Sequence, residues 1–440
     1  MQPDTIIYTI IVIGMVLGVM ATGTWICFAL MGTSIFALMF LGRGNMEFIL
    51  ESVLFQSINS YTLVAMPMFI FMGEMLIKSG CSEYLFKGVK KVLAPFPGGM
   101  LHTNIVACSI FSATSGSSTA TTVAIGSVSI PELTKQGYDR GITLGSICSG
   151  GTLGVLIPPS IMMILYGSLT GNSIGRLFIA GILPGLFLAG MFMIYIAFAC
   201  TVNPKLAPPR APFGGVKKYT IGVLSSFLDL WPVFLLIGGI MFSIYGGFAT
   251  PTEAGAVSCL LALLIWVFIY RTFTPALFKD AIKGTIIINA QLMASIIAAR
   301  ALGMALSMLN IPTEISAAIS GLPVSPYVIW AMVVVIYILL GCFVDGIDLL
   351  IITVPVFYPV MVLGLGFDPI WFGVVLTLVI QMSLITPPAG FNLLVTHSIS
   401  GSKDMMETIK GSLPFVVVMI ITLIIFTIFP GIATYLPSLM

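Results

Sequence analysis

Residues 112–122 read SATSGSSTATT, a run of small and mostly hydroxylated side chains within strongly apolar sequence. Serine and threonine hydroxyls, together with backbone carbonyls freed where a helix unwinds, suit a bare Na⁺ ion. Backbone N–H groups at the start of a helix favour an anion instead. Small hydroxylated residues also line close helix–helix contacts in membranes. A break in the helix at this run, recurring elsewhere in the chain, would favour the binding interpretation.

The composition requires a membrane environment. The chain has 440 residues, of which 58% are hydrophobic and 8% are charged, whereas a soluble globular protein carries about 25% charged residues. Such a chain cannot cover itself with a water-facing surface, so we predict an all-α polytopic membrane protein that contacts the lipid bilayer and no nucleic acid. Its seven cysteines form no CxxC or Cys/His cluster, which indicates core residues rather than metal ligands.

Apolar runs of about 17–25 residues predict about 10–11 transmembrane helices. Ten full spans are expected at 5–22, 24–42, 53–78, 140–170, 177–201, 220–246, 252–270, 285–309, 369–398 and 412–436. Two further segments, 98–136 and 326–365, are interrupted halfway, and their halves of about 12–16 residues are too short to span a bilayer comfortably. We expect them to be re-entrant hairpins. The spans at 140–170 and 369–398 are broken helices, each interrupted at a double proline.

These interruptions form an internal repeat with an offset of 228–230 residues. The matched pairs are Pro131 and Pro359, Asp139 and Asp368, Pro158-Pro159 and Pro387-Pro388, Pro184 and Pro414, and the tips at Gly116 and Asp345. Each half then has five spans and one hairpin. Because five is odd, the second half enters the membrane with the opposite orientation. The sequence therefore predicts two inverted repeats, residues 1–218 and residues 219–440.

Basic residues predict the orientation. With the loop after the third span in the cytoplasm, all but three of the 18 Lys and Arg residues fall inside; Arg43 and Arg176 fall outside and Arg300 lies within a span. Both termini are then expected to be periplasmic.

Arg300 is the basic residue that lies within a span. An intramembrane arginine is costly and is interpreted as functional by default, and its guanidinium fork suits a substrate carboxylate. Pairing with an acid on a partner chain, or snorkelling to an interface, would also explain it.

The remaining charged residues near breaks have open or structural interpretations. Asp345 and Asp348 at the second tip could hold Na⁺ or couple a proton, or could cap a helix. Glu253 is expected to cap a helix start with Thr250 or Thr252. The sequence contains no GxxxxGK[ST] loop, no HExxH and no GxSxG. We therefore predict that the protein is not an enzyme and that an ion gradient drives it.

Five motifs taken together, SGSSTATTVAIGS, PELTKQGYDR, GGTLGVLIPPS, ATPTEAGAV and TPPAGFNLLV, resemble the large membrane subunit of tripartite ATP-independent periplasmic (TRAP) transporters over residues 5–436. The resemblance implies an elevator-type fold, in which the hairpins and broken helices form a transport domain and the remaining helices a scaffold. It implies two partners, a separate small four-helix membrane subunit and a periplasmic substrate-binding protein. It also implies uptake of an organic acid, with Na⁺ as coupling ion, across the bacterial inner membrane.

The resemblance also implies individual site residues. The first sodium would lie between Ser112 and Ser115 and the first broken helix at Gly154, Ile157 and Pro159. The second would lie between Asp345 and Gly346 and the second broken helix at Thr386, Ala389 and Asn392. The substrate would face Ser117, Ser118, Thr119 and Arg300.

Alternatives remain at this stage. A stand-alone ion-coupled carboxylate carrier would need no binding protein, and an ion channel belongs to a different class. The inverted repeat with unwound helices favours an alternating-access carrier over a channel. Sialic acid, a dicarboxylate, a sugar acid or another carboxylate are all open as the substrate.

Overall fold

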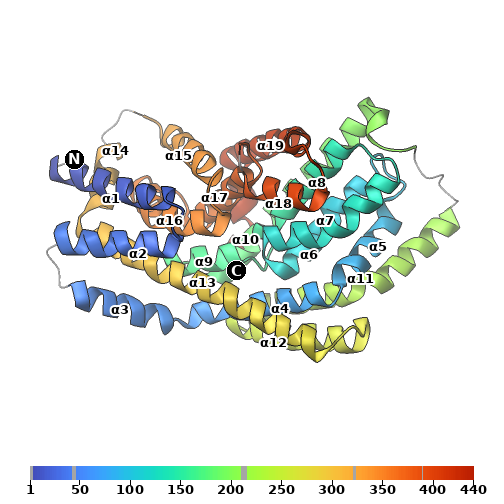
Figure 1. The fold of residues 1–440 in the computed structure, drawn as a ribbon, viewed down its shortest axis with the longest axis horizontal. Coiled ribbons are helices and arrows are strands. Elements are labelled where there is room, and N and C mark those ends of the chain that lie inside the picture. Colours follow the sequence, from blue (N-terminus) through green and yellow to red (C-terminus); the bar gives the residue numbers. More distant parts are fainter. Residues whose placement is uncertain (1–2, 42–45, 210–215, 321–323, 389) are drawn as a thin grey trace.

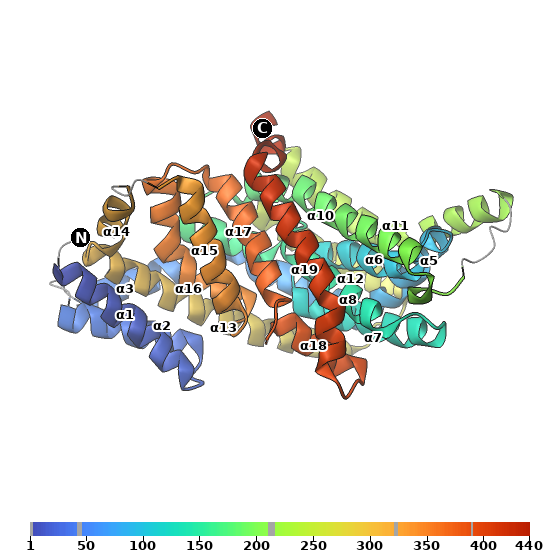
Figure 2. The ribbon, with the colours of Figure 1, turned by 90° about the horizontal axis from the view of Figure 1, so that it is seen from above.

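The computed structural model describes residues 3–41, 46–209, 216–320, 324–388 and 390–440. These residues form α-helices with short 3-10 and π segments, and no strand occurs among them (Figures 1 and 2). Within the described ranges, seven helices have the length and apolar composition needed to cross a membrane. The predicted all-α polytopic membrane fold is confirmed.

Each half of the chain contains corresponding helices, which occur in the same order along the sequence. In the first half they are α1 (Pro3–Ala21), α2 (Ile26–Phe36), α3 (Met46–Ile58), α4 (Ala65–Lys78), α5 (Cys81–Leu93), α6 (Met100–Ser115), α7 (Ser118–Lys135), α8 (Arg140–Thr152), α9 (Ile161–Thr170) and α10 (Ile174–Val202). In the second half they are α11 (Val216–Tyr245), α12 (Pro251–Leu264), α13 (Pro275–Met308), α14 (Ile311–Ser320), α15 (Pro326–Gly341), α16 (Gly346–Tyr358), α17 (Pro369–Leu384), α18 (Phe391–Ser400), α19 (Met405–Ile428) and α20 (Gly431–Thr434). The hairpins are α6–α7 and α15–α16, and the broken helices are α8–α9 and α17–α18.

Two predictions of helix length are wrong. The span expected at 53–78 is divided between α3 and α4, with a 3-10 turn at Tyr61–Val64. The second arm of each hairpin also exceeds the expected 12–16 residues, since α7 has 18 residues and α16 continues through a π segment as a 19-residue helix ending at Gly364. The first arms, α6 and α15, have 16 residues each, as expected. The hydroxyl-rich run is helical on both sides of the tip, and its hydroxyls are satisfied by the preceding turn; Thr114 Oγ1, for example, donates to the Phe111 carbonyl at 2.6 Å.

Polar side chains start the helices at matching places in the two halves. Asp139 caps α8 by accepting a hydrogen bond from the Ile142 N–H at 3.1 Å, and Asp368 caps α17 in the same way. These caps satisfy N–H groups that have no partner within the helix. At α12, the Thr250 and Glu253 side chains form a reciprocal capping box, which confirms the structural interpretation of Glu253.

The helices pack into two groups, which we name the frame and the hairpin body. The frame comprises α1–α5 and α11–α14, with the long α13 lying against α2, α3 and α4 (Figure 1). The hairpin body comprises α6–α10 and α15–α19. Within it the halves interlock, because α9 packs on α16 of the other half and α18 packs on α7 and α8. Helices α10 and α19 pack on the broken helices, although the resemblance assigned them to the scaffold.

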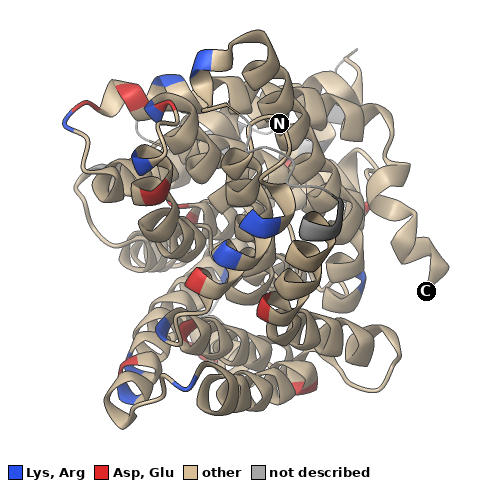
Figure 3. Ribbon diagram, turned by 90° about the vertical axis from the view of Figure 1, so that its right-hand side faces the viewer, with Lys and Arg blue, Asp and Glu red and all other residues tan. Residues whose placement is uncertain are grey.

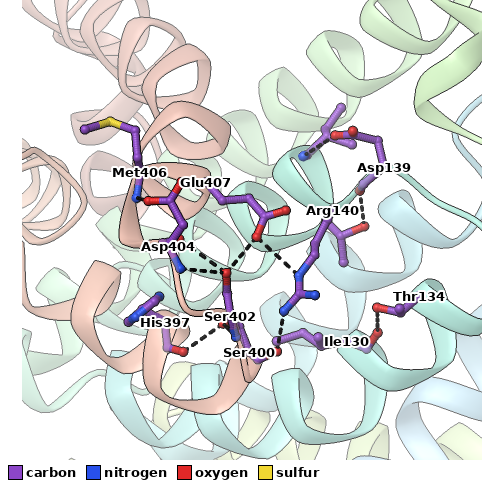
Figure 4. Close-up of polar contacts among 12 residues, drawn as sticks. Ile130, Thr134, Asp139, Arg140, His397, Ser400, Ser402, Asp404, Met406 and Glu407 are labelled. Atoms are coloured by element: carbon purple, nitrogen blue, oxygen red, sulfur yellow. Dashed lines mark hydrogen bonds and ion pairs between the residues drawn. The ribbon is translucent and has the colours of Figure 1, made fainter.

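A polar cluster joins the two halves of the hairpin body at one end. Arg140, at the start of α8, lies with its Nε 3.3 Å from an oxygen of Glu407 on α19 and donates from Nη2 to the carbonyl of Ser400 at 2.9 Å (Figure 4). Beside this cluster α8 and α19 cross closely at Gly145 and Gly411, where a side chain on either residue would overlap backbone atoms. The crossing therefore requires glycine at both positions.

Charged residues are sparse on the described helices. A view of the end that carries α5, α7, α8 and α11 shows short blue and red segments on a largely tan ribbon (Figure 3). At this end Lys90 pairs with Glu132 of α7 at 2.7 Å, and Lys91 pairs with Asp229 of α11 at 2.6 Å. Such partly exposed pairs contribute little to stability. The Lys90–Glu132 pair links α5 of the frame to the hairpin body, whereas the Lys91–Asp229 pair joins two helices of the frame.

Candidate functional site

The first hairpin tip is a two-residue turn between α6 and α7. Gly116 has φ +61°, a left-handed conformation that glycine adopts without strain, and its N–H donates to the Ser112 carbonyl at 2.8 Å. Ser117 then caps α7 by accepting from the Ala120 N–H at 3.4 Å. The predicted interruption is therefore present, but it spans only Gly116 and Ser117.

Buried hydroxyls close this tip from within. Ser115 Oγ lies 2.9 Å from Thr121 Oγ1, and Thr121 Oγ1 donates to the Ser117 carbonyl at 2.8 Å. Ser115 is 5% exposed and Thr121 is fully buried. The hydroxyls thus face protein rather than lipid, as oxygen ligands inside a membrane must.

The first tip packs against the break between α8 and α9. A Cβ on Gly154 would lie 2.7 Å from Ser112 Cβ, and a Cβ on Gly116 would lie 3.4 Å from the Pro159 carbonyl oxygen. The Pro158–Pro159 peptide bond is cis, and Ser160 caps α9 by accepting from the Met163 N–H. These residues bring hydroxyl and carbonyl oxygens into one region.

The predicted first sodium ligands lie mainly in this region. The structure brings Ser112, Gly154 and Pro159 to the contact between tip and break, and Ser115 lies on the same tip. Ile157 belongs to the same break, and its side chain packs towards Gly185 of α10. Its ligand atom would be the backbone carbonyl oxygen.

The second tip repeats this packing with the residue types exchanged. A Cβ on Gly341 of α15 would overlap Ser383 of α17, so a glycine of the hairpin faces a serine of the broken helix. In the first half, Ser112 of the hairpin faces Gly154 of the broken helix. Cys342 Sγ also lies 3.5 Å from the Pro387 carbonyl oxygen, so the second tip meets the second break.

The predicted ligands of the second sodium do not all lie at one contact, unlike most of those of the first. Asp345 caps α16 through the Ile347 N–H at 3.3 Å, and Thr386 Oγ1 donates to the Met382 carbonyl at 2.6 Å. The Asn392 amide turns to the first half, donating to Thr122 Oγ1 and to the carbonyl of Cys148, both at 3.2 Å. Gly346 lies at the second tip, and Ala389 lies outside the described residues.

Both hairpin tips lie against the start of α9. Ile161 lies beside Gly116 of the first tip, with its Cγ1 3.1 Å from where a Cβ would be, and Met162 lies beside Gly346 of the second. Ser118 and Thr119 continue α7 from the first tip. No three His, Cys, Asp or Glu side chains cluster as metal ligands in the part of the chain that the structure describes.

Arg300 lies in a separate pocket of about 460 Å³. Its Nη2 donates to the Ser168 hydroxyl at 2.9 Å and to the Ser168 carbonyl at 3.1 Å. Ser168 is seven residues beyond Ile161 on α9, about 10 Å along the helix. The structure therefore does not place Arg300 beside Ser117, Ser118 and Thr119, with which it was predicted to share the substrate.

The other pocket residues were missed at the sequence level. Polar side chains from three segments line it with Arg300: Gln56 of α3, Ser168 and Thr170 of α9, and Tyr358 of α16. The stretch YGSLTGN at the end of the first broken helix carried a polar signal. Nothing in the sequence connected α3 or α16 to Arg300.

A helical protein with membrane-spanning helices, in which two hairpin tips meet two broken helices, has the features of a membrane transporter. More specifically, the chain belongs to the family described as the tripartite ATP-independent periplasmic transporter, DctM component, whose model matches residues 13–432. The predicted family is confirmed.

Named relatives span nearly the whole chain. The C4-dicarboxylate TRAP transporter large permease protein DctM of Vibrio cholerae is 34% identical over 97% of this chain and 96% of its own. The ectoine TRAP transporter large permease protein TeaC of Halomonas elongata is 31% identical over 98% and 99%, and the sialic acid large permease SiaM of Vibrio cholerae is 28% identical over 96% and 97%. These relatives are named as permeases, not enzymes, and for different substrates.

Among solved structures, the crystal structure of the Alcanivorax borkumensis YdaH transporter has a similar fold. The TM-score is 0.53, over 86% of this chain and 89% of that chain, at 14% sequence identity. The similarity supports the fold and leaves the substrate open.

Proposed function

We propose that this large permease imports an organic anion that binds at Arg300, with Na⁺ as the coupling ion. One observation carries the proposal: Arg300 is an intramembrane cation that faces a pocket and makes no ion pair with a described residue. A half-buried charge without a counterion is costly. A bound carboxylate would supply the missing charge and accept charge-assisted hydrogen bonds from the guanidinium.

The Ser168 contacts prepare Arg300 for this role. Both bonds come from Nη2, which fixes the guanidinium plane and leaves Nε and Nη1 as donors for the ligand. Preorganised donors of this kind bind a ligand at a lower entropic cost.

Sodium ions would bind where the tips meet the breaks. At the first tip the proposed ligands are the Ser112 and Ser115 hydroxyls with the carbonyls of Gly154, Ile157 and Pro159. At the second tip they are Asp345 and Gly346 with Thr386, while the observed contacts of Asn392 favour a role in joining the halves. A Na⁺ ion bound between a tip and its break would hold the hairpin against the broken helix. Ion binding would then favour one position of the hairpin over another.

Movement of the hairpin body against the frame would give alternating access. We place α10 and α19 in the moving unit, because they pack on the broken helices. A separate small membrane subunit and a periplasmic binding protein would complete the transporter in the bacterial inner membrane, with both termini in the periplasm.

Uptake into proteoliposomes tests this function. The vesicles contain the chain and its small membrane subunit, and labelled organic acids are supplied with or without the binding protein under an inward Na⁺ gradient. The proposal expects saturable uptake that requires both Na⁺ and the binding protein. Uptake without the binding protein would indicate a stand-alone carrier, and a current that does not saturate would indicate a channel.

A further inference from the structure

We infer that the Arg300 pocket selects carboxylates with a single negative charge and rejects dicarboxylates of the same length. This inference rests on the proposed function and narrows its substrate class. The named relatives do not decide the matter, because their substrates differ. The charge distribution around the pocket does.

One positive charge lines the pocket. Of the residues that surround it, all described by the structure, Arg300 alone is charged. A dicarboxylate that pairs one end with Arg300 would leave its second carboxylate without a cation inside a membrane protein. Burial of such a charge is unfavourable, whereas a neutral polar group at the same place can be satisfied by hydrogen bonds.

Helix ends around the pocket make a second carboxylate still less favourable. Ser168 and Thr170 belong to the last turn of α9, which ends at Gly171, and Gln56 belongs to the last turn of α3. The C-terminal end of a helix carries a partial negative charge. The pocket therefore lies beside the C-terminal turns of two helices, and Arg300 donates to the Ser168 carbonyl of one of them.

The polar groups away from Arg300 are uncharged, and two of them offer acceptors to donors on the ligand. Tyr358 accepts from the Asn172 amide at 3.2 Å, so its hydroxyl is a neutral donor. Gln56 uses its Nε2 to donate to Ser52 Oγ at 3.0 Å, which leaves its carbonyl oxygen as an acceptor. Thr170 Oγ1 donates to the Tyr166 carbonyl and accepts from Asn172 at 2.7 Å. A ligand with a hydroxyl, an amide N–H or an ammonium group opposite its carboxylate therefore matches the pocket better than a second anion.

Matched probes that differ by one charge test this inference. Succinate and succinamate have the same length, as have glutarate and glutaramate, but only the amides carry a single charge. Ligand-dependent thermal stabilisation of the purified full chain, in Na⁺, measures their affinities without selection by a binding protein. We expect the monoanion of at least one pair to bind 10-fold or more tightly than its dianion, and Arg300→Gln to remove that binding.

The controls distinguish a failure of the charge selection from a failure of the Arg300 binding site. Arg176→Gln removes an exposed arginine outside the pocket and should leave binding unchanged. Dianions that bind more tightly than their amides, and lose this binding in Arg300→Gln, would overturn the charge selection while supporting the Arg300 site. Binding that survives Arg300→Gln, or no binding by any probe, would overturn the site and with it the proposed function.

Discussion

At the level of single residues, Ser115 is the proposed sodium ligand whose hydroxyl also lies inside the first hairpin tip. Its Oγ lies 2.9 Å from Thr121 Oγ1 inside the first turn. We predict that Ser115→Ala raises the Na⁺ concentration for half-maximal uptake on the order of tenfold, equivalent to about 1.4 kcal/mol, while membrane assembly is unchanged. The variant loses a ligand oxygen and loosens the turn. Sodium-dependent uptake in proteoliposomes measures the change.

Ser109→Ala is the matched control. Ser109 lies on the same helix and donates only locally, to the Ile105 carbonyl at 2.7 Å. Its substitution should leave sodium activation unaltered. An identical sodium response for Ser115→Ala and the unmodified chain would remove Ser115 from the ion site.

Arg300 can be tested by keeping its charge and changing its shape. Lysine carries the same charge but cannot offer a planar fork to a carboxylate. We predict that Arg300→Lys weakens uptake by about 10-fold, roughly 1.4 kcal/mol, and that Arg300→Gln abolishes it. Concentration-dependent uptake of the transported acid provides the measurement. Equal uptake by the glutamine variant would show that the substrate does not depend on this charge.

At the scale of elements, the two hairpins pack on their broken helices through one serine and one glycine in opposite order. Ser112 faces Gly154 in the first half, and Gly341 faces Ser383 in the second. We predict that Gly154→Ser alone lowers the free energy of unfolding by about 1–3 kcal/mol through overpacking. Adding Ser112→Gly should recover most of this loss, because it recreates the arrangement of the second half.

Thermal unfolding of the single and double variants measures this coupling. Gly190→Ser on α10 is the control, because no atom lies within 4 Å of a Cβ at Gly190. A double variant no more stable than Gly154→Ser would show that the two contacts are not equivalent.

Most of the helices and their ends could be predicted from residues close together in the sequence. The hairpins, their breaks and the cap that Thr250 and Glu253 form at α12 could be predicted, because glycine, double prolines and capping residues act over a few positions. The division between α3 and α4 lacked such a signal. The partners of Arg300 and Asn392 could not be predicted, since helices distant in sequence supply them and only packing brings them together.

At the scale of the whole molecule, the frame meets the hairpin body along several helix–helix contacts. One lies between α13 and α16, where a Cβ on Gly303 would be 3.4 Å from Pro355 Cβ. Disulfides form at Cβ separations of about 3.5–4.5 Å. A cysteine at each position should therefore cross-link the second hairpin to the frame with little rearrangement.

We predict that the Gly303→Cys and Pro355→Cys double variant stops uptake when oxidised and regains it when reduced, because alternating access requires the hairpin body to move against the frame. Each single variant should be insensitive to the oxidant, which controls for the seven native cysteines. Both positions also line the Arg300 pocket, so ligand-dependent thermal stabilisation must be measured on the oxidised protein. Retained ligand binding with arrested uptake would show that motion is blocked rather than the site. Undiminished uptake by fully cross-linked protein would contradict movement between these two bodies.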